Sequence, residues 1–525
     1  MLKRSSLKAI KKRRVAVYVT IYLLLLAAAV LYTTSVYKHS QFGDAQVDEI
    51  MYYLTNGLSD GKSFDFLEAV RDNLLLLLIL FFLLLLPVID FYRDRITVHF
   101  SMAVFGTNKS LAFNPSRVPL GLKLAYAIVA FLISLWIVLS SFHAISYIIS
   151  LTQTSHVFEE HYVDPRNVKL EFPAKKRNLV YIYMESMENT PASTANGGQM
   201  TPSRIPELEK LALDPDNIAF SNHPSGLGGA LPATGTTWTV AGMTAQSSGT
   251  MLRDSLFGLG QNGQGALSRF LPGSYGLGEV LAAEGYSQSF IMGSQASFGG
   301  RDKLLNQHGD YRVMDLEYMK KAGKLPSDYS VWWGFEDRKL FEFGRQEATR
   351  LASEGKPFNL QLLTADTHFT DGYLDPTCPT PFKVQYDNVH ACSSARVAEF
   401  VRWIQAQPFG ANTTIILTGD HLGMQTAWYD GAIKTPGYQR TVYNAFVNPA
   451  IKTEHSHGRL FTTFDMYPTT LAALGVRVPG EHLGLGVNLF SGEPTLLETY
   501  GSLNALNEEL GKRSQYYEKH IVNGQ

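Results

Sequence analysis

Residues 179–185 read LVYIYME, and residues 414–421 read TIILTGDH. Both runs are short, apolar and rich in β-branched or aromatic residues, and neither alternates strictly between apolar and polar positions. This pattern predicts buried strands of a parallel sheet. Because the carboxyl ends of parallel strands meet at one edge of a sheet, where ligands bind, we expect Glu185, Asp420 and His421 to lie together.

The rest of the C-terminal two thirds of the chain repeats this pattern. Further β-rich runs lie at residues 287–292, 358–363 and 442–447, and stretches of helical period lie at 207–213, 340–352 and 395–406. Strands that alternate with helices predict an α/β domain with a mainly parallel central sheet flanked by helices. We expect this domain to span residues 178–525, after a polar connector over residues 152–177.

Three apolar stretches precede the connector, at about residues 15–37, 73–92 and 124–151. A helix needs about 20 apolar residues to cross the hydrocarbon layer of a bilayer. The first and third stretches meet this length. The second meets it only with its flanking residues, so a buried core helix is the alternative there. The sequence predicts a three-helix transmembrane region over residues 1–151.

The charges of the loops predict the orientation of these helices. The first 14 residues carry seven Lys or Arg, the segment before the second stretch is acidic, and the next loop is basic again. Since cytoplasmic loops carry the excess of basic residues, the N-terminus is predicted to be cytoplasmic and everything after residue 151 to be exported. The chain as a whole has 46 Lys and Arg against 47 Asp and Glu, which gives no indication of a nucleic-acid partner.

The only two cysteines, Cys378 and Cys392, both fall in the exported part. An oxidising compartment favours a disulfide between them, and two free buried thiols are the alternative.

The polar residues at the strand ends have the chemistry of a metal site. Two carboxylates and one imidazole, from Glu185, Asp420 and His421, suit one divalent ion such as Mn²⁺ or Zn²⁺. Each residue alone could instead be a helix cap or a turn residue. The three together predict a metal centre.

Three other residues are candidates for phosphate chemistry. Thr236 follows a Gly-rich stretch at residues 226–235 and precedes a helical pattern, so its hydroxyl could meet a phosphate at a helix start. A metal ion is the natural activator of a threonine hydroxyl, although an ordinary N-cap is the alternative. His368 follows the strand at 358–363 and could shuttle a proton, and Arg301 could bind phosphate. Solvated surface roles are the alternatives for both.

In chain order, these motifs resemble the alkaline phosphatase and sulfatase superfamily, and within it the branch of the lipoteichoic acid synthases. The matching pieces are VYIYMES at 180–186, GTTWTVAGM at 235–243, WGFED at 333–337, TGDH at 418–421 and FDMYPTT at 464–470. Residues 366–373 (DTHFTDGY) and 419–428 (GDHLGMQTAW) further resemble the phosphoglycerol transferases that act on osmoregulated periplasmic glucans.

The resemblance implies metal-dependent transfer of phosphoglycerol from phosphatidylglycerol to an extracytoplasmic glycan, with a periplasmic glucan as the expected acceptor. It implies a covalent intermediate on threonine. The residues that it assigns are Thr236 as nucleophile and metal ligand, Glu185, Asp420 and His421 as metal ligands, and His368 and Arg301 as phosphate contacts.

The resemblance also implies a multi-pass protein of the bacterial inner membrane whose catalytic domain lies in the periplasm. Its expected partners are the lipid donor, the glycan acceptor and the bilayer. Three alternatives remain: a phosphoethanolamine transferase that acts on lipid A or a glycan, a phosphodiesterase or sulfatase-like hydrolase, and a catalytically inactive membrane scaffold.

Overall fold

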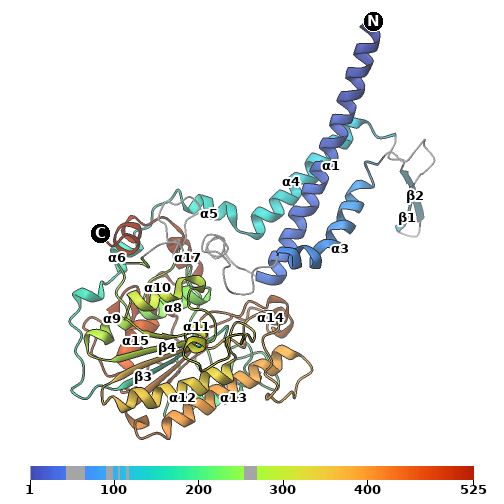
Figure 1. Ribbon diagram of the computed structural model, residues 1–525. Coiled ribbons are helices and arrows are strands. Elements are labelled where there is room, and N and C mark those ends of the chain that lie inside the picture. Colours follow the sequence, from blue (N-terminus) through green and yellow to red (C-terminus); the bar gives the residue numbers. More distant parts are fainter. Residues whose placement is uncertain (1, 43–65, 90–97, 105–106, 114–116, 254–268) are drawn as a thin grey trace. The chain divides into compact units, whose positions relative to one another are not determined.

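The structure is a computed structural model that describes residues 2–42, 66–89, 98–104, 107–113, 117–253 and 269–525 (Figure 1). The described residues separate into two compact units, and the boundary between them lies at residues 145 and 146.

The N-terminal unit contains helices α1 (Leu2–Phe42), α3 (Phe66–Leu85) and α4 (Leu120–Ser141), and an antiparallel hairpin of β1 (Val98–Val104) and β2 (Thr107–Phe113). Two of its segments are long and apolar enough to cross a membrane, Lys12–His39 and Leu120–Ser141. The apolar part of α3, Asn73–Leu85, is shorter than a span requires. The described residues therefore contain two candidate spans where the sequence predicted three.

The third apolar stretch, predicted as one span at 124–151, is divided between two helices in the structure. Helix α4 begins earlier, at Leu120, and ends at Ser141. His143 then takes a left-handed backbone conformation with a φ of 51°, which ends the helix, and a separate short helix α5 follows at Ala144–Ser150. Residues 90–92 of the second predicted span lie outside the described residues, and so does most of the acidic segment that contributed to the predicted orientation.

The second unit is built on a six-stranded sheet with the order β5-β4-β6-β3-β7-β8. The strands are β3 (Asn178–Met184), β4 (Ser287–Met292), β5 (Arg312–Met314), β6 (Phe358–Leu363), β7 (Thr413–Gly419) and β8 (Asn444–Val447). All neighbouring strands pair in parallel except β8, which pairs antiparallel with β7. The predicted α/β class and mainly parallel sheet are confirmed.

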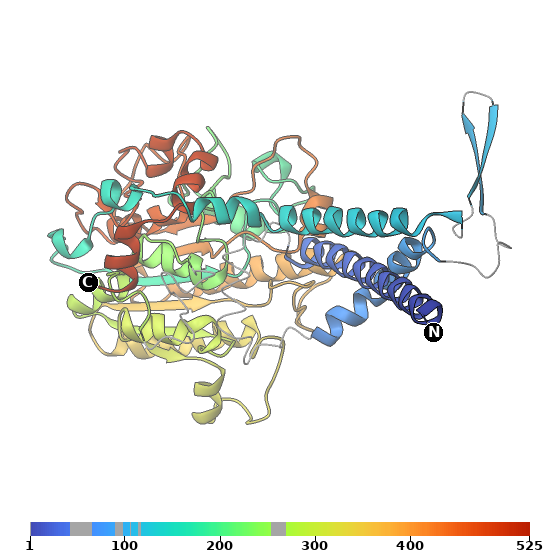
Figure 2. The same cartoon turned by 90° about the horizontal axis from the view of Figure 1, so that it is seen from above.

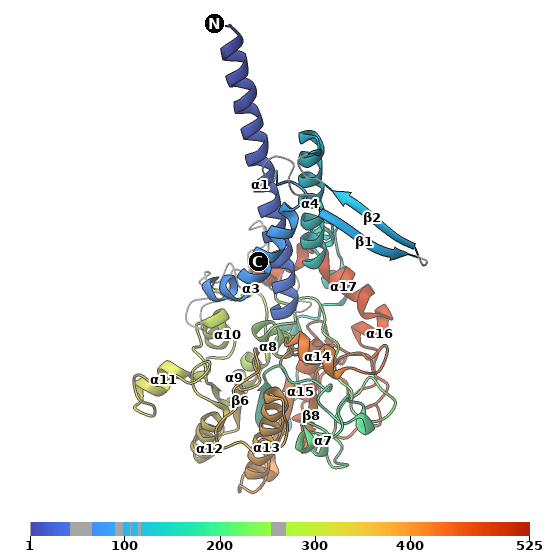
Figure 3. The same ribbon diagram turned by 90° about the vertical axis from the view of Figure 1, so that its right-hand side faces the viewer.

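Helices cover both faces of this sheet, so its central strands are buried on both sides (Figure 2). One face packs against α7 (Pro206–Ala212), α11 (Leu316–Lys321), α12 (Asp337–Ser353) and α13 (Gln385–Gln405). Figure 3 shows α12 and α13 side by side. The other face packs against α8 (Thr239–Ser248), α9 (Leu277–Ala283), α10 (Arg301–Gln307), α15 (Met466–Ala473) and α17 (Leu503–Gly511). Short elements complete the unit: α6 (Val157–His161), α14 (Thr426–Ala432), α16 (Leu496–Tyr500), β9 (His482–Leu483) and β10 (Gly486–Val487).

Strand β3 shows why the run at 179–184 lacks alternation. Tyr181 and Tyr183 point into one hydrophobic core, and Val180 and Ile182 point into the other. A strand between two cores has no solvent-facing side, so every position is apolar.

The segment 152–177 is part of the folded domain and not a free connector. Val157 and Phe158 of α6 are buried in the core of the second unit. The ring of Phe158 lies 5.0 Å from that of Tyr517, and the backbone N–H of Ser155 donates to the carbonyl of Arg513 at 2.9 Å. The domain therefore begins before residue 178.

Cys378 and Cys392 form a disulfide, as the sequence predicted. It joins the loop after β6 to helix α13 across a sequence separation of 14 residues. We expect the double variant Cys378→Ser/Cys392→Ser to lose on the order of 3 kcal/mol of unfolding free energy, because the disulfide restricts the unfolded chain. Thermal unfolding of the full chain would measure this, and reduced wild type serves as the control. An unchanged melting temperature in both samples would contradict the expectation.

Candidate active site

Two strand ends bring three metal-ligating side chains together. Glu185 follows β3, and Asp420 and His421 follow β7, whose last residue pairs with the last residue of β3. Nε2 of His421 lies 3.5 Å from Oε1 of Glu185 and 3.5 Å from Oδ2 of Asp420. One ligand atom from each residue lies within 4.8 Å of the others, and all three residues are buried. This edge of the sheet therefore presents the donor set that the strand ends predicted.

Hydrogen bonds prepare this donor set for a cation. Nδ1 of His421 lies 2.7 Å from the carbonyl oxygen of Leu422, which can only accept. The ring proton is therefore on Nδ1, and Nε2 presents its lone pair to the carboxylates. Oδ1 of Asp420 accepts from the backbone N–H groups of Ser186 and His421, both at 2.8 Å.

The other oxygen of Asp420 indicates what is needed to complete the cluster. Oδ2 is fully buried and accepts no hydrogen bond from any residue that the structure describes. Burial, together with the neighbouring Glu185 carboxylate, raises the pKa of Asp420 to about 7. A buried carboxylate oxygen without a hydrogen-bond donor costs free energy. A divalent cation would offset both this cost and the repulsion between the carboxylates of Asp420 and Glu185. The residues present thus fit one divalent ion of the Mn²⁺ or Zn²⁺ type.

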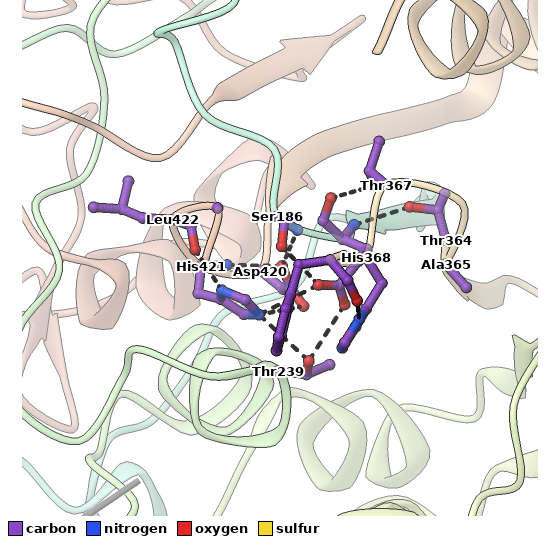
Figure 4. A network of polar contacts seen from close by, with 12 residues as sticks. Ser186, Thr239, Thr364, Ala365, Thr367, His368, Asp420, His421 and Leu422 are labelled. Atoms are coloured by element: carbon purple, nitrogen blue, oxygen red, sulfur yellow. Dashed lines mark hydrogen bonds and ion pairs between the residues drawn. The ribbon is translucent and has the colours of Figure 1, made fainter. Parts of the chain in front are cut away.

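A threonine hydroxyl faces the cluster, and it belongs to Thr239. Its Oγ1 lies 3.3 Å from Oε2 of Glu185 and 3.4 Å from Nε2 of His421. Figure 4 shows Thr239 beside Asp420, with His421 on one side of the group and His368 on the other. Thr239 is the first residue of α8, and its side chain is partly exposed. The N-cap residue of α8 gives no side-chain hydrogen bond to the helix, so the first N–H groups of α8 can receive an anion.

The prediction that Thr236 supplies this hydroxyl is not what the geometry shows. Oγ1 of Thr236 donates to the carbonyl of Ala233 at 2.8 Å, and the residue is only 1% exposed. Thr236 lies in the turn before the helix, where its hydroxyl satisfies the local backbone. The structure therefore places Thr239, three residues later, in the position that the sequence analysis gave to Thr236.

Close packing of α8 against the end of β7 holds Thr239 in place. A Cβ atom on Gly242, one turn after Thr239, would lie 2.0 Å from the carbonyl oxygen of Asp420, so only glycine allows this approach. Nε2 of Gln246, one turn further on, donates to the carbonyl of Gly419 at 2.9 Å. These contacts fix the first turn of α8 over the metal cluster.

Comparison with known proteins identifies the family of the chain. Residues 177–476, more than half of the chain, match the sulfatase family. The chain belongs to the sulfatase family. Within it, the chain is similar to the phosphoglycerol transferase I of Citrobacter koseri, with 32% identity over 281 residues, 52% of this chain and 34% of the relative. The same protein of Salmonella paratyphi B is 33% identical over 279 residues, with the same coverage. The chain thus spans about a third of the length of the curated relatives that it matches.

Among solved structures, this sulfatase-family chain is similar to the lipoteichoic acid synthase LtaP of Listeria monocytogenes. The two share 14% sequence identity with a TM-score of 0.50, and the similarity covers 70% of this chain and 98% of the other. At this identity the likeness shows a common fold. It supports the sheet and helix arrangement described above.

His368 lies beside the cluster, on the loop after β6. Its Nδ1 lies 2.7 Å from the carbonyl oxygen of Phe369, so Nδ1 carries the ring proton. Burial lowers the pKa of His368 below its ordinary value, and the charges of His421 and Arg301 act in the same direction, against the opposing effect of Glu185. His368 is therefore neutral near pH 7, with Nε2 able to accept a proton.

Arg301 lies near His368 but is held by the backbone. It is the first residue of α10, and its Nε and Nη2 donate to the carbonyls of Phe298 and Gln295, each at 2.9 Å. These bonds fix the guanidinium close enough for its charge to act on His368. Arg301 thus places a buried positive charge near His368.

Sequence reasoning missed the residues that fasten the loops of this site to one another. Oγ1 of Thr364 accepts from the backbone N–H of Glu185 at 2.9 Å, and the hydroxyl of Thr367 donates to the carbonyl of Glu185. The hydroxyl of Ser186 donates to Oε1 of Glu185 at 2.7 Å. These small polar residues follow strand ends, which was the available indication. Thr364 and Thr367 follow β6 but bond to Glu185, which follows β3, and a single sequence does not identify that pairing.

Proposed function

We propose that the chain is a metal-dependent phosphotransferase that moves phosphoglycerol from phosphatidylglycerol to an extracytoplasmic glycan such as a periplasmic glucan. The observation that carries the proposal is the partly exposed hydroxyl of Thr239 at a helix start, against the buried cluster of Glu185, Asp420 and His421. The similarity to phosphoglycerol transferases supports the choice of the transferred group.

In this proposal the apolar helices α1 and α4 anchor the protein in a bacterial inner membrane, and the second unit is a periplasmic catalytic domain. Anchoring the domain at the membrane raises its effective concentration toward a lipid donor. The disulfide is consistent with an oxidising compartment.

The first half of the proposed reaction forms a covalent intermediate on Thr239. A cation bound by the cluster supplies Lewis acidity and offsets negative charge. Oγ1 of Thr239 attacks the phosphorus of the donor, and its proton passes to Nε2 of His368. As the Oγ1–P bond forms, the bond from phosphorus to the diacylglycerol oxygen breaks, and His368 returns the proton to that oxygen. Diacylglycerol leaves, and phosphoglycerol remains as a diester on Thr239.

The second half repeats the displacement in the opposite direction. His368 accepts the proton of an acceptor hydroxyl as the oxygen of that hydroxyl attacks phosphorus. The bond from phosphorus to Oγ1 breaks, and the proton passes to Thr239, which restores the starting state. The N–H groups at the start of α8 and the charge of Arg301 stabilise the negative phosphoryl oxygens in both halves.

An assay of diacylglycerol release tests the proposal. Purified full-length protein with phosphatidylglycerol alone should release diacylglycerol slowly, because water is a poorly oriented second nucleophile. A suitable glucan should accelerate the release while phosphoglycerol appears on the sugar. Fast release that no glucan changes, with free glycerol phosphate as product, would instead indicate a hydrolase. Turnover of phosphatidylethanolamine but not phosphatidylglycerol would indicate a phosphoethanolamine transferase.

A further inference from the structure

A cavity of about 520 Å³ lies between helices α7, α12 and α13 and the loop of residues 377–382. None of the residues of the metal cluster lines it, and neither do Thr239 and His368. Its apolar walls come from Phe341 and Phe382 and from three prolines of the surrounding segments. Three arginines, Arg338, Arg345 and Arg396, and two glutamates supply the charged part of the lining, and small residues fill the remainder. The volume and the mixed lining are those of a small-molecule site.

The charges of this cavity are already balanced. Arg338 pairs with Glu336 at 2.8 Å and with Asp375 at 3.2 Å. Arg345 pairs with Glu399 at 2.6 Å, and Arg396 pairs with Asp366 at 3.3 Å and with Asp375 at 3.0 Å. Each guanidinium of the lining therefore has a carboxylate partner, so the cavity provides no excess positive field for a phosphate or an anionic lipid head group. The planar ion pairs still provide hydrogen-bond donors and acceptors.

The cavity is also built in advance of any ligand. The backbone N–H and carbonyl of Phe382 are held by the side chain of Asn388, at 2.9 and 2.8 Å. The guanidinium of Arg204 lies over the Phe382 ring at 4.0 Å, and the disulfide to Cys392 fastens the loop to α13. A fixed ring beside balanced ion pairs suits a neutral ligand that has apolar ring faces and many hydroxyl groups, which is the chemistry of a sugar chain.

We infer that this cavity is a holding site for the acceptor glycan, which binds a neutral stretch of the sugar chain away from the hydroxyl that reacts. The inference rests on the proposed transferase function. Arg396 in the cavity wall donates to Asp366, two residues before His368, so the cavity adjoins the loop that carries the proton-transfer group. A long glycan held there would raise the local concentration of its remaining hydroxyls at the catalytic threonine.

Direct binding of a sugar chain tests the inference without any turnover. The probe is a neutral, linear β-linked glucose oligosaccharide, titrated calorimetrically into full-length protein in detergent. Phe382→Ala and Arg345→Gln alter two separate walls of the cavity, and each should raise the dissociation constant by about tenfold or more. In transfer assays both should raise KM for the glucan and leave kcat nearly unchanged. Val384→Ala is the matched control, because Val384 is 48% exposed and does not line the cavity.

The outcomes separate this site from the proposed function. Weaker binding in both cavity variants, with melting temperatures close to wild type and unchanged binding in Val384→Ala, supports the inference. The same result without any transfer from phosphatidylglycerol would retain the sugar site and reject the proposed donor chemistry. Absence of oligosaccharide binding to wild type, or equal binding by wild type and both cavity variants, would overturn the inference. Displacement of the bound oligosaccharide by glycerol phosphate would also overturn the inference, because it would indicate a site for anions.

Discussion

Replacing Thr239 by alanine is expected to lower donor turnover by at least about a thousandfold, because the hydroxyl that forms the covalent intermediate is removed. The hydroxyl contacts Glu185 and His421 at the start of α8. Release of diacylglycerol from phosphatidylglycerol would measure the effect, with and without glucan. Both activities should disappear together, since both pass through the same intermediate.

Thr236→Ala is the matched control for this variant. It removes a hydroxyl from the same segment, but that hydroxyl donates to the carbonyl of Ala233. We expect a loss of about 1 kcal/mol in stability and less than about tenfold in turnover. The reverse result, an active Thr239→Ala variant and an inactive but folded Thr236→Ala variant, would show that Thr236 is the nucleophile.

Removing a metal ligand is expected to abolish both metal binding and activity while the fold remains. Asp420→Asn keeps the carbonyl oxygen that accepts from the backbone of Ser186 and His421, so the strand end should stay in place. The substitution removes the negative charge of Asp420 beside Glu185, and a divalent ion needs that charge in order to bind. We expect at least about a tenfold loss of bound metal and a larger loss of turnover.

His421→Ala tests the imidazole of the same cluster. Metal content, measured by mass spectrometry of the purified protein, and circular dichroism should be recorded for both variants. Removal of the metal with a chelator and later addition of Mn²⁺ or Zn²⁺ should restore the turnover of wild type. The same treatment should not restore the turnover of either variant. Full metal occupancy and normal turnover in either variant would remove that residue from the ligand set.

Much of the fold could be predicted from the sequence because the central strands lie between two cores. Positions between two cores are filled mainly by apolar residues, so the apolar runs of β3 and β7 stand out from their surroundings, whereas β4 and β6 also bury polar residues such as Gln288 and Asn359. Strand β5 has only three residues, and its first, Arg312, is exposed, so no apolar run marks it. The antiparallel direction of β8 likewise comes from tertiary packing and leaves no mark on the sequence.

The metal cluster could be predicted for a related reason. Glu185, Asp420 and His421 follow two neighbouring parallel strands that each contain an apolar run, and the topology of a parallel sheet brings residues at such strand ends to one edge. The threonine could not be chosen this way. Its position depends on how closely α8 approaches β7, a long-range contact that glycine at position 242 permits. The same glycine, one turn after Thr239, is the feature that could have indicated the correct residue.

The N-terminal helices illustrate the limits of hydropathy. An apolar run from 124 to 151 predicted one helix, but the backbone turns at His143 and a second helix begins. Composition gives the apolar length and not the position of a break in the backbone, because a single left-handed residue ends a helix without changing the hydropathy.

Mass spectrometry of the protein after incubation with phosphatidylglycerol tests the central claim most directly. Residues 211–253 form one tryptic peptide, since no Lys or Arg lies between Lys210 and Arg253, and fragmentation within it separates Thr236 from Thr239. We predict a mass increase of one phosphoglycerol group on Thr239, which disappears when a glucan is added. Absence of the adduct in protein that releases diacylglycerol, or an adduct on Thr236, would contradict the account.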